Sequence, residues 1–187
     1  NRNGCQRCFA DCPYAAIEMG PHPTGRGLIA LVDADRCASC GICAGACPSS
    51  TPFRSDARLV TGIDLPDLGV DALRTELQAR LEAHRGPAPI VAFSCGYAAT
   101  PAAAPDVVPI ALPCAAMLAP AFVEYALRQG ARGIAVVSCP PEDCEYRFGA
   151  RWTAQRLAGE REPRLRGAAA RERIRLIEAA REDLISL

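Results

Sequence analysis

Residues 37 to 48 read Cys37-Ala-Ser-Cys40-Gly-Ile-Cys43-Ala-Gly-Ala-Cys47-Pro48, and this stretch decides how the chain folds. Three thiolates in one tight loop can each reach a different iron of a cubane. A fourth thiolate, four residues further on, points away and binds a neighbouring cluster. The proline after Cys47 turns the chain, because it cannot continue a helix. The spacing therefore predicts a [4Fe–4S] cluster with a second cluster beside it.

A partial copy of this motif lies upstream and also ends in a proline: Cys5, Cys8, Cys12 and Pro13. By the two-cluster rule, the ligands of one [4Fe–4S] cluster are Cys12, Cys37, Cys40 and Cys43. The other [4Fe–4S] cluster takes Cys5, Cys8 and Cys47, and its fourth ligand is expected near residue 2, which is Arg. Two such motifs in a chain of 187 residues indicate electron transfer.

Three explanations for the missing fourth ligand stay open. Either the cysteine precedes residue 1 in a longer protein, or the cluster has three irons or a ligand other than cysteine, or the site is degenerate and empty. We favour the first explanation, because the chain begins inside a motif.

The composition excludes several classes of function. All 21 basic residues are arginine and 21 acidic residues balance them, so the chain lacks the basic face of a nucleic-acid-binding protein. Without lysine there is no Walker-type phosphate loop and no Schiff-base chemistry. No apolar run is long enough to span a bilayer and no segment resembles a signal peptide, so we expect a cytoplasmic protein. Eleven cysteines in such a protein bind metal more often than they form disulfides.

The chain divides into a cysteine-rich region and an α/β region. Residues 1–55 hold seven cysteines and little helical periodicity, and clusters would act as the core of so small a domain. A strand over 28–32 is expected to pair around the Gly/Pro-rich turn at 20–27. Residues 56–88 form a linker with a helix over 70–84, where apolar residues recur at helical spacing, and this helix is expected to pack on the second region.

Residues 89–187 have the pattern of an α/β domain. Apolar runs predict strands at 89–94, 107–112 and 133–138, and helices are expected at 115–129 and 148–158. Alternation favours a further strand over 173–177. Strands that alternate with helices imply a mostly parallel sheet. The expected fold class is an α+β ferredoxin-like cluster domain followed by an α/β domain.

Three of these expected strands end near a cysteine, namely Cys95, Cys114 and Cys139. Functional groups gather at the carboxyl ends of strands in an open parallel sheet. Cys144 follows Cys139 in Cys-Pro-Pro-Glu-Asp-Cys, whose prolines stiffen the loop. A single cysteine at a strand end is more often a core residue. Four thiolates from three segments suit a binuclear iron–sulfur centre or a zinc site, and iron is favoured because the neighbouring domain handles electrons.

The same segments resemble a known family. Ile110-Ala-Leu-Pro-Cys114 and Gly130-Ala-Arg-Gly-Ile-Ala-Val-Val-Ser-Cys139-Pro-Pro-Glu-Asp-Cys144-Glu-Tyr-Arg resemble the delta subunit of methyl-viologen-reducing hydrogenase. Gly149-Ala-Arg-Trp-Thr, with Arg156, is similar to the GN-x-x-x-x-x-R region of this family, although Ala150 stands where Asn is usual. The resemblance covers residues 89–185, and residues 1–53 independently resemble dicluster ferredoxins.

The family resemblance implies a [2Fe–2S] cluster on Cys95, Cys114, Cys139 and Cys144. It also implies a conduit for electrons between a redox partner, which is a hydrogenase or another dehydrogenase, and a flavin-containing subunit similar to heterodisulfide reductase. The expected cofactors are thus two [4Fe–4S] clusters and one [2Fe–2S] cluster. No acid–base pair or nucleophile triad stands out, so we expect no substrate site in this chain itself.

Two other functions stay open. An iron–sulfur redox sensor or regulatory module would use the clusters for switching, but no basic helix-turn-helix is visible and the Arg-rich residues 151–175 are interleaved with glutamate. A zinc-stapled interaction domain accommodates the second group of cysteines, but it explains the two N-terminal motifs poorly.

Overall fold

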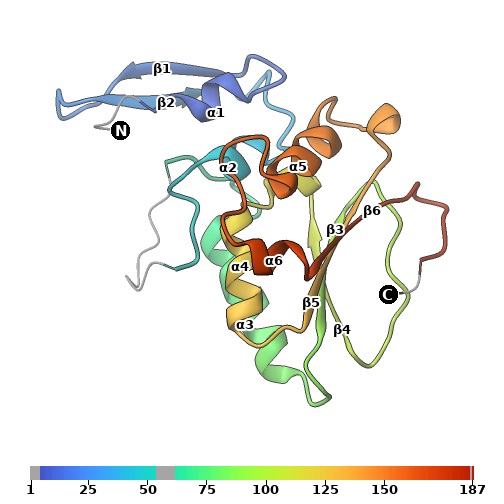
Figure 1. Ribbon diagram of the computed structural model, residues 1–187. Helices are drawn as coiled ribbons and strands as arrows, with labels where there is room; N and C mark the ends of the chain where they lie inside the picture. The colour runs from blue at the N-terminus through green and yellow to red at the C-terminus, as the bar shows by residue number, and fades with distance from the viewer. Residues whose placement is uncertain (1–4, 54–61, 186) are drawn as a thin grey trace.

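Two sheets of different kinds organise the chain (Figure 1). The computed structural model describes residues 5–53, 62–185 and 187. Its N-terminal part contains a two-stranded antiparallel sheet, and its larger part contains a sheet of four parallel strands. The expected fold class, an α+β ferredoxin-like start followed by an α/β domain, is confirmed.

The N-terminal part is a hairpin accompanied by two short helices. β1 (Ile17–Pro21) pairs with β2 (Leu28–Val32) around the expected turn. The helices α1 (Arg7–Ala10) and α2 (Ile42–Ala46) each lie within a cysteine motif. α2 is almost wholly buried, whereas β2 has only half-buried and exposed residues. The hairpin therefore contributes little to a hydrophobic core.

The helix α3 (Val70–Ala83) lies where the apolar spacing predicted a helix. Its buried residues include Leu73 and Leu77. Asp64 Oδ1 accepts a hydrogen bond from the backbone N–H of Val70 at 2.9 Å, which satisfies one donor of the first turn. The expected domain boundary at residues 55–56 lies outside the described residues, so the division of the chain into three segments stays a prediction.

The parallel sheet has the strand order β4-β3-β5-β6. In that order the strands are β4 (Val107–Leu112), β3 (Ile90–Cys95), β5 (Gly133–Ser138) and β6 (Ile174–Glu178). Each strand expected in this region is present. β3 and β5 lie in the middle and are the most buried, as is usual for parallel strands covered on both faces. Because all four strands run the same way, their carboxyl ends lie at one edge.

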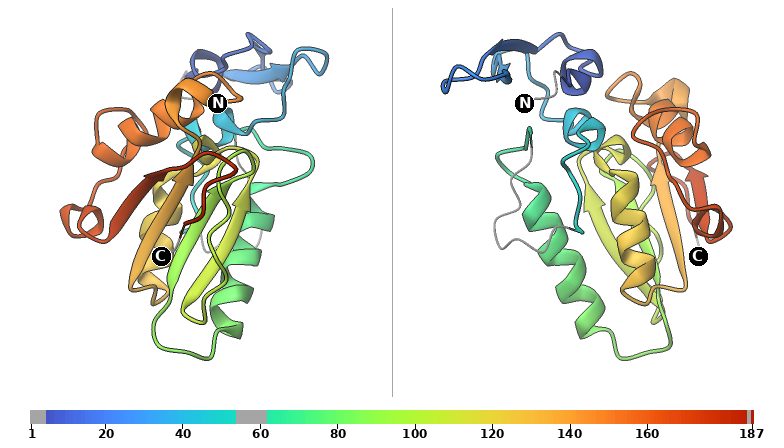
Figure 2. Two further views of the ribbon diagram at one scale, coloured as in Figure 1. Left: turned by 90° about the vertical axis from the view of Figure 1, so that its right-hand side faces the viewer. Right: turned by 60° about the vertical axis from the view of Figure 1, so that its left-hand side comes forward.

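Helices cover one face of this sheet and irregular segments lie on the other (Figures 1 and 2). α3 and α4 (Pro120–Arg128) are on the helical side. On the other side, the backbone N–H of Ala99 donates a hydrogen bond to the carbonyl of Ala179 at 3.3 Å, which joins the segment after β3 to the segment after β6. The short helix α6 (Ala168–Arg171) precedes β6. None of the described helices is both long and apolar enough to cross a membrane.

The helix expected over 115–129 begins later than the sequence indicated. Ala115–Met117 form a single 3-10 turn, η1, and α4 starts only at Pro120. A proline suits a first helical turn, because its missing N–H would have no helical partner there. The apolar residues of η1 are all buried, so they serve packing rather than one face of a helix. The helix expected over 148–158 is confirmed as α5 (Gly149–Ala158).

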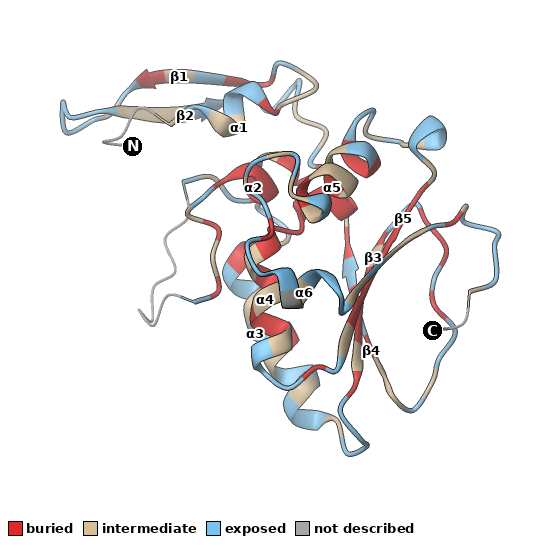
Figure 3. Ribbon diagram, in the orientation of Figure 1, coloured by how far each residue is buried: buried red, intermediate tan, exposed pale blue. Residues whose placement is uncertain are grey.

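The buried interior continues from the parallel sheet into the N-terminal part (Figure 3). Both parts share a small hydrophobic cluster, formed by Cys40, Ile42, Cys114 and Ala116. Gly41 has a φ of +76°, and a Cβ there would lie 2.8 Å from Cγ of Met117. Only glycine permits that conformation together with so close an approach of α2 to η1. The N-terminal part is therefore packed directly onto the carboxyl edge of the sheet.

Candidate metal centres

The four cysteines expected to bind one [4Fe–4S] cluster line a common cavity. It has a volume of about 230 Å³ and also contacts β1 and residues 63–66. Its wall includes the four expected ligands, Cys12, Cys37, Cys40 and Cys43. Most other lining side chains are apolar, among them Ile17, Val32 and Leu65. A cavity walled by four thiols and by apolar side chains fits a cubane and shields it from water.

The thiols of this first centre affect one another's ionisation. Burial raises the pKa of Cys43 to about 12, with the neighbouring Cys40 adding to the effect. Burial also raises the pKa of Cys40, and Cys12 and Cys37 add to it. Because metals bind thiolates, the positive charge of iron has to favour ionisation at this site. The backbone N–H of Ala16 donates to Cys12 Sγ at 3.3 Å, a contact of the kind that tunes cluster potentials.

The second expected [4Fe–4S] set is described in part. Burial raises the pKa of Cys8, and the charges of Cys47 and Cys5 raise it further, so these three thiols are neighbours. A Cβ on Gly62 would lie 3.1 Å from Cys47 Sγ, so residue 62 closes over that sulfur. The fourth ligand, expected near residue 2, lies outside the described residues. Cysteines of both motifs thus come together here, and their role as ligands of a second cluster stays a prediction.

The remaining four cysteines gather at the carboxyl edge of the parallel sheet. Cys95 ends β3, Cys114 follows β4 and Cys139 follows β5. Cys144 follows a 3-10 turn, η2 (Pro141–Asp143), which brings it back towards the same edge. The first three are buried and Cys144 is half-buried. Because β4, β3 and β5 are adjacent in the sheet, the three strand ends hold their cysteines side by side.

These four thiols lie next to one another and form a closed ring. Cys114 and Cys139 each contact both Cys95 and Cys144. Side-chain interactions within the ring lower the pKa of Cys95 and Cys144 and raise the pKa of Cys114 and Cys139. Four thiols that already contact one another fit a binuclear centre, in which each iron takes two of them.

The start of α5 completes the setting of this ring. A Cβ on Gly149 would overlap Cys114 Sγ and would lie 3.5 Å from Cys144 Sγ. The backbone N–H of Ala150 donates to Cys144 Sγ at 3.4 Å. The backbone therefore approaches the sulfurs closely at a position where only glycine fits. Ala150 contributes its N–H, which is independent of the side chain that family members usually carry there.

A mononuclear metal site is not apparent in the described residues. No group of three or more His, Cys, Asp or Glu side chains within residues 5–53 and 62–185 is arranged so as to hold a metal ion. A structural zinc site needs four donors around one point. Cluster ligands are distributed over two or four irons and need not meet at one point. Which metal the four thiols bind is therefore decided by the metal content of the purified protein.

The first centre and the ring of four thiols are next to each other. Cys40 and Cys114 belong to one buried cluster, against which Tyr14 and Tyr146 pack. Burial raises the pKa of Tyr14, and the charges of Cys40 and Cys114 both add to it. Burial also raises the pKa of Tyr146, to which a hydrogen bond with Tyr97 and the same two cysteines contribute. Tyr14 and Tyr146 therefore each lie near Cys40 of the first centre and near Cys114 of the ring.

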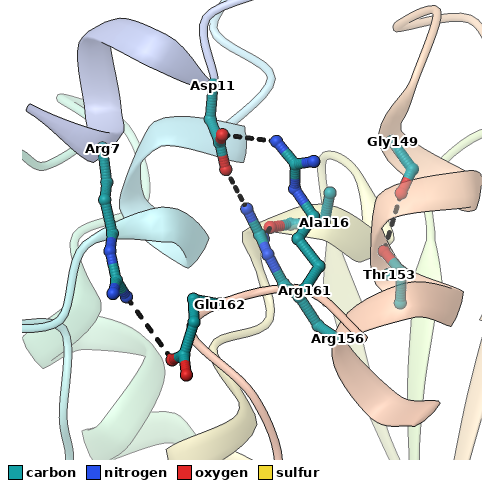
Figure 4. A network of polar contacts seen from close by, with 8 residues as sticks. All are labelled: Arg7, Asp11, Ala116, Gly149, Thr153, Arg156, Arg161 and Glu162. Carbon is teal, nitrogen blue, oxygen red and sulfur yellow. Dashed lines mark hydrogen bonds and ion pairs between the residues drawn. The ribbon is translucent and has the colours of Figure 1, made fainter. Parts of the chain in front are cut away.

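A buried ion-pair network links the same two regions (Figure 4). Arg156 of α5 donates through Nη2 to Asp11 Oδ2 at 2.8 Å, and Arg161 donates to Asp11 Oδ1 at 2.5 Å. Arg7 and Glu162 form a further ion pair at 3.7 Å. The family resemblance drew attention to Arg156, but no sequence pattern indicated Asp11, because 145 residues separate the two. The one signal at Asp11 is its position directly before Cys12.

Comparison with known families agrees with both resemblances. Residues 90–185 match a family model described as methyl-viologen-reducing hydrogenase, delta subunit. Residues 1–51 match one described as a 4Fe-4S dicluster domain. A search among curated proteins found no match to this chain. The two matched segments correspond to the hairpin part with its two cysteine motifs and to the part built on the parallel sheet.

Proposed function

Because this chain belongs to the family of methyl-viologen-reducing hydrogenase delta subunits, we propose that it passes electrons through three iron–sulfur centres. Together with its 4Fe-4S dicluster domain, this membership makes the chain an electron-transfer iron–sulfur subunit. We assign one [4Fe–4S] cluster to Cys12, Cys37, Cys40 and Cys43, and the other to Cys5, Cys8 and Cys47 with a further ligand. We assign a [2Fe–2S] cluster to Cys95, Cys114, Cys139 and Cys144.

One observation carries this proposal above the others. Cys40 from the first centre and Cys114 from the thiol ring lie in the same buried hydrophobic cluster. Electron transfer slows steeply with distance, so centres held by neighbouring residues can exchange electrons rapidly. Close spacing of this kind is what an electron-transfer subunit requires.

The chain itself would position the centres and keep them dry. The clusters, when bound, supply one-electron redox chemistry. The parallel strands fix Cys95, Cys114 and Cys139, and the contact of η1 with α2 fixes the spacing between this centre and the cubane. Ile42 and Ala116 are buried together with Cys40 and Cys114, so they would help to keep water away from the two centres.

We further propose that the partners are a hydrogenase or another dehydrogenase on one side and a flavoprotein similar to heterodisulfide reductase on the other, in the cytoplasm. The family name supports a hydrogenase-like donor. The loop over η2 supports docking near the binuclear centre, because Glu142 and Asp143 are exposed directly beside the half-buried Cys144. A redox partner that bound this loop would approach the centre closely.

The proposal is tested by the iron and acid-labile sulfide content of protein purified without oxygen, together with EPR spectra of the reduced form. We expect about ten irons per chain and signals from both cubane and binuclear centres. Cys139→Ser should remove the binuclear signal and about two irons while leaving the cubane signals. Ser138→Ala is the matched control, because Ser138 is equally buried, adjacent and without a hydrogen bond at its Oγ.

Other outcomes would contradict specific parts of this assignment. About eight irons without a binuclear signal would leave a dicluster ferredoxin attached to a structural α/β domain. Zinc in place of the missing iron would favour an interaction role for residues 89–187. Loss of every cluster in Cys139→Ser would contradict separate ligand sets.

A further inference from the structure

We propose that the buried guanidinium of Arg156 raises the reduction potential of the centre at Cys95, Cys114, Cys139 and Cys144, and that Asp11 of the dicluster part opposes it. This inference rests on the proposed function, since it requires a redox centre at those cysteines. An ion pair between the two parts of the chain would thus set the reduction potential of this centre, and with it whether an electron resides there. Arg156 is a positioning and tuning residue in this proposal, and it binds no iron.

Arg156 contacts three of the segments that carry the expected ligands. Its side chain is 1% exposed. Nη1 donates to the carbonyl of Ala116 at 2.9 Å, two residues beyond Cys114, and Nη2 donates to Asp11, which directly precedes Cys12. A Cβ on Gly45, between Cys43 and Cys47, would lie 3.0 Å from Nη1. The cation is thus enclosed where the ligand loops meet.

The network around this cation carries an excess of positive charge. Two guanidinium groups, of Arg156 and Arg161, share the single carboxylate of Asp11. The Nε atoms of both arginines are buried and without a partner. Burying such an excess is costly unless another negative charge lies close by. Cys114 lies two residues before the carbonyl that Arg156 contacts, and as a thiolate ligand of a bound centre it would supply this second negative charge.

Electrostatics then determine the direction of the effect. An iron–sulfur centre bound by four thiolates is anionic, and it gains one more negative charge on reduction. A fixed cation nearby stabilises the reduced form more than the oxidised form, which raises the potential. Solvent cannot screen this cation, because it is enclosed by protein. A fixed carboxylate has the opposite effect, and Asp11 is the carboxylate that neutralises part of the charge.

Two substitutions that break the same ion pair separate this account from a purely mechanical role. Arg156→Gln removes a cation and Asp11→Asn removes an anion. We expect the first to lower the potential of the binuclear centre and the second to raise it. If the pair served only to hold the two parts together, both variants would disturb the centre in the same direction.

The experiment is a redox titration of anaerobically purified full-length protein, followed by the EPR signal of the reduced binuclear centre. For Arg156→Gln we expect about a tenfold loss in the equilibrium constant for reduction, which is about 59 mV for a one-electron couple. Arg156→Lys keeps the cation and should stay closer to the unmodified protein. Arg161→Gln removes a cation that is 28% exposed and should lower the potential by less.

The matched control is Arg147→Gln. Arg147 also bridges the two parts, since Nη1 donates to the carbonyl of Pro13 at 3.2 Å and its guanidinium lies 5.4 Å from the ring centre of Tyr14. It is exposed, so water and salt screen its charge and its loss should leave the potential unchanged. The iron content of each variant shows whether the centres have assembled.

Several results would overturn the inference. One is a potential of the binuclear centre in Arg156→Gln, at full iron content, that equals the potential in unmodified protein. Another is a shift of this potential in the same direction in Arg156→Gln and in Asp11→Asn. If Asp11→Asn does not fold, a potential in Arg161→Gln that is unchanged or higher contradicts it equally. Failure of the proposed function is recognised separately, because unmodified protein would then lack the binuclear signal altogether, and the inference would fall with it.

Discussion

Gly149 leaves room for the sulfur of Cys114. The site therefore requires a glycine at this position as strictly as it requires its cysteines. A Cβ at that position would overlap the sulfur, whereas the backbone of the next residue donates a hydrogen bond to Cys144. A similar restriction holds at Gly45, where a Cβ would overlap the carbonyl oxygen of Ala116. A Cβ atom at either position would therefore push apart groups that are in contact, which are a sulfur and the backbone at Gly149 and two backbone segments at Gly45.

Gly149→Ala should therefore disturb the binuclear centre selectively. We expect a loss of up to about two irons per chain and of the binuclear EPR signal, with the cubane signals unchanged. Gly167→Ala is the control, because a Cβ there would meet Ala170 at an ordinary 3.6 Å. Full iron content and an unaltered signal in Gly149→Ala would show that the sulfur of Cys114 has another position available.

At the scale of elements, α3 is part of the core of the parallel sheet. Leu73 and Leu77 are fully buried and belong to the same hydrophobic cluster as the strands, and Leu81 packs at its margin. The apolar spacing predicted a linker helix that packs on the α/β region, and the burial of Leu73 and Leu77 against the strands agrees with this. Spacing identified the buried face correctly, and the contact with the sheet shows what that face covers.

Leu77→Ala should lower the free energy of unfolding by about 2–5 kcal/mol, because it removes a fully buried side chain and leaves a cavity. The measurement is the midpoint of urea unfolding followed by circular dichroism. Leu81→Ala is the matched variant and should have a smaller effect, since Leu81 is only partly buried. Equal effects of the two would argue against α3 being anchored through Leu77.

We expect the hairpin β1–β2 to depend on a bound cluster in a way that the parallel sheet does not. β2 buries none of its residues fully, whereas β3 and β5 are largely buried. Removing iron with a chelator should therefore abolish amide-exchange protection in β1 and β2 and preserve it in β3 and β5. Protection of the hairpin that survives complete removal of iron would contradict a cluster-based core.

The elements that could be predicted from the sequence are those with a local pattern of apolar residues. The strands at 107–112 and 133–138 were found to the residue because short apolar runs ended by turns leave few alternatives. The start of α4 was placed five residues early, because the buried run from Ala115 also has helical composition. That run is buried against α2, far away in the sequence. The pairing of Asp11 with Arg156 arises from the same docking and likewise has no local signal.

At the scale of the whole molecule, docking of the N-terminal part would determine which of the two proposed cubanes faces the proposed binuclear centre. Cys40 shares a buried cluster with Cys114, and no described ligand of the other set, Cys5, Cys8 or Cys47, belongs to that cluster. The path for electrons would then run from the binuclear centre to the Cys40 cubane first. The second cubane would be reached only through the first.

The order of centres can be tested by magnetic coupling in the fully reduced protein. Paramagnetic centres close together broaden or split each other's EPR signals, so the binuclear signal should show an interaction in unmodified protein. Cys40→Ala should abolish this interaction, because it removes a ligand of the adjacent cubane. Cys8→Ala should preserve it, because it affects the cubane further away. The reverse pattern, with coupling lost in Cys8→Ala and kept in Cys40→Ala, would place the other cubane next to the binuclear centre. The iron content of both variants shows whether each has lost one cubane only. The comparison then assigns which cubane lies next to the binuclear centre.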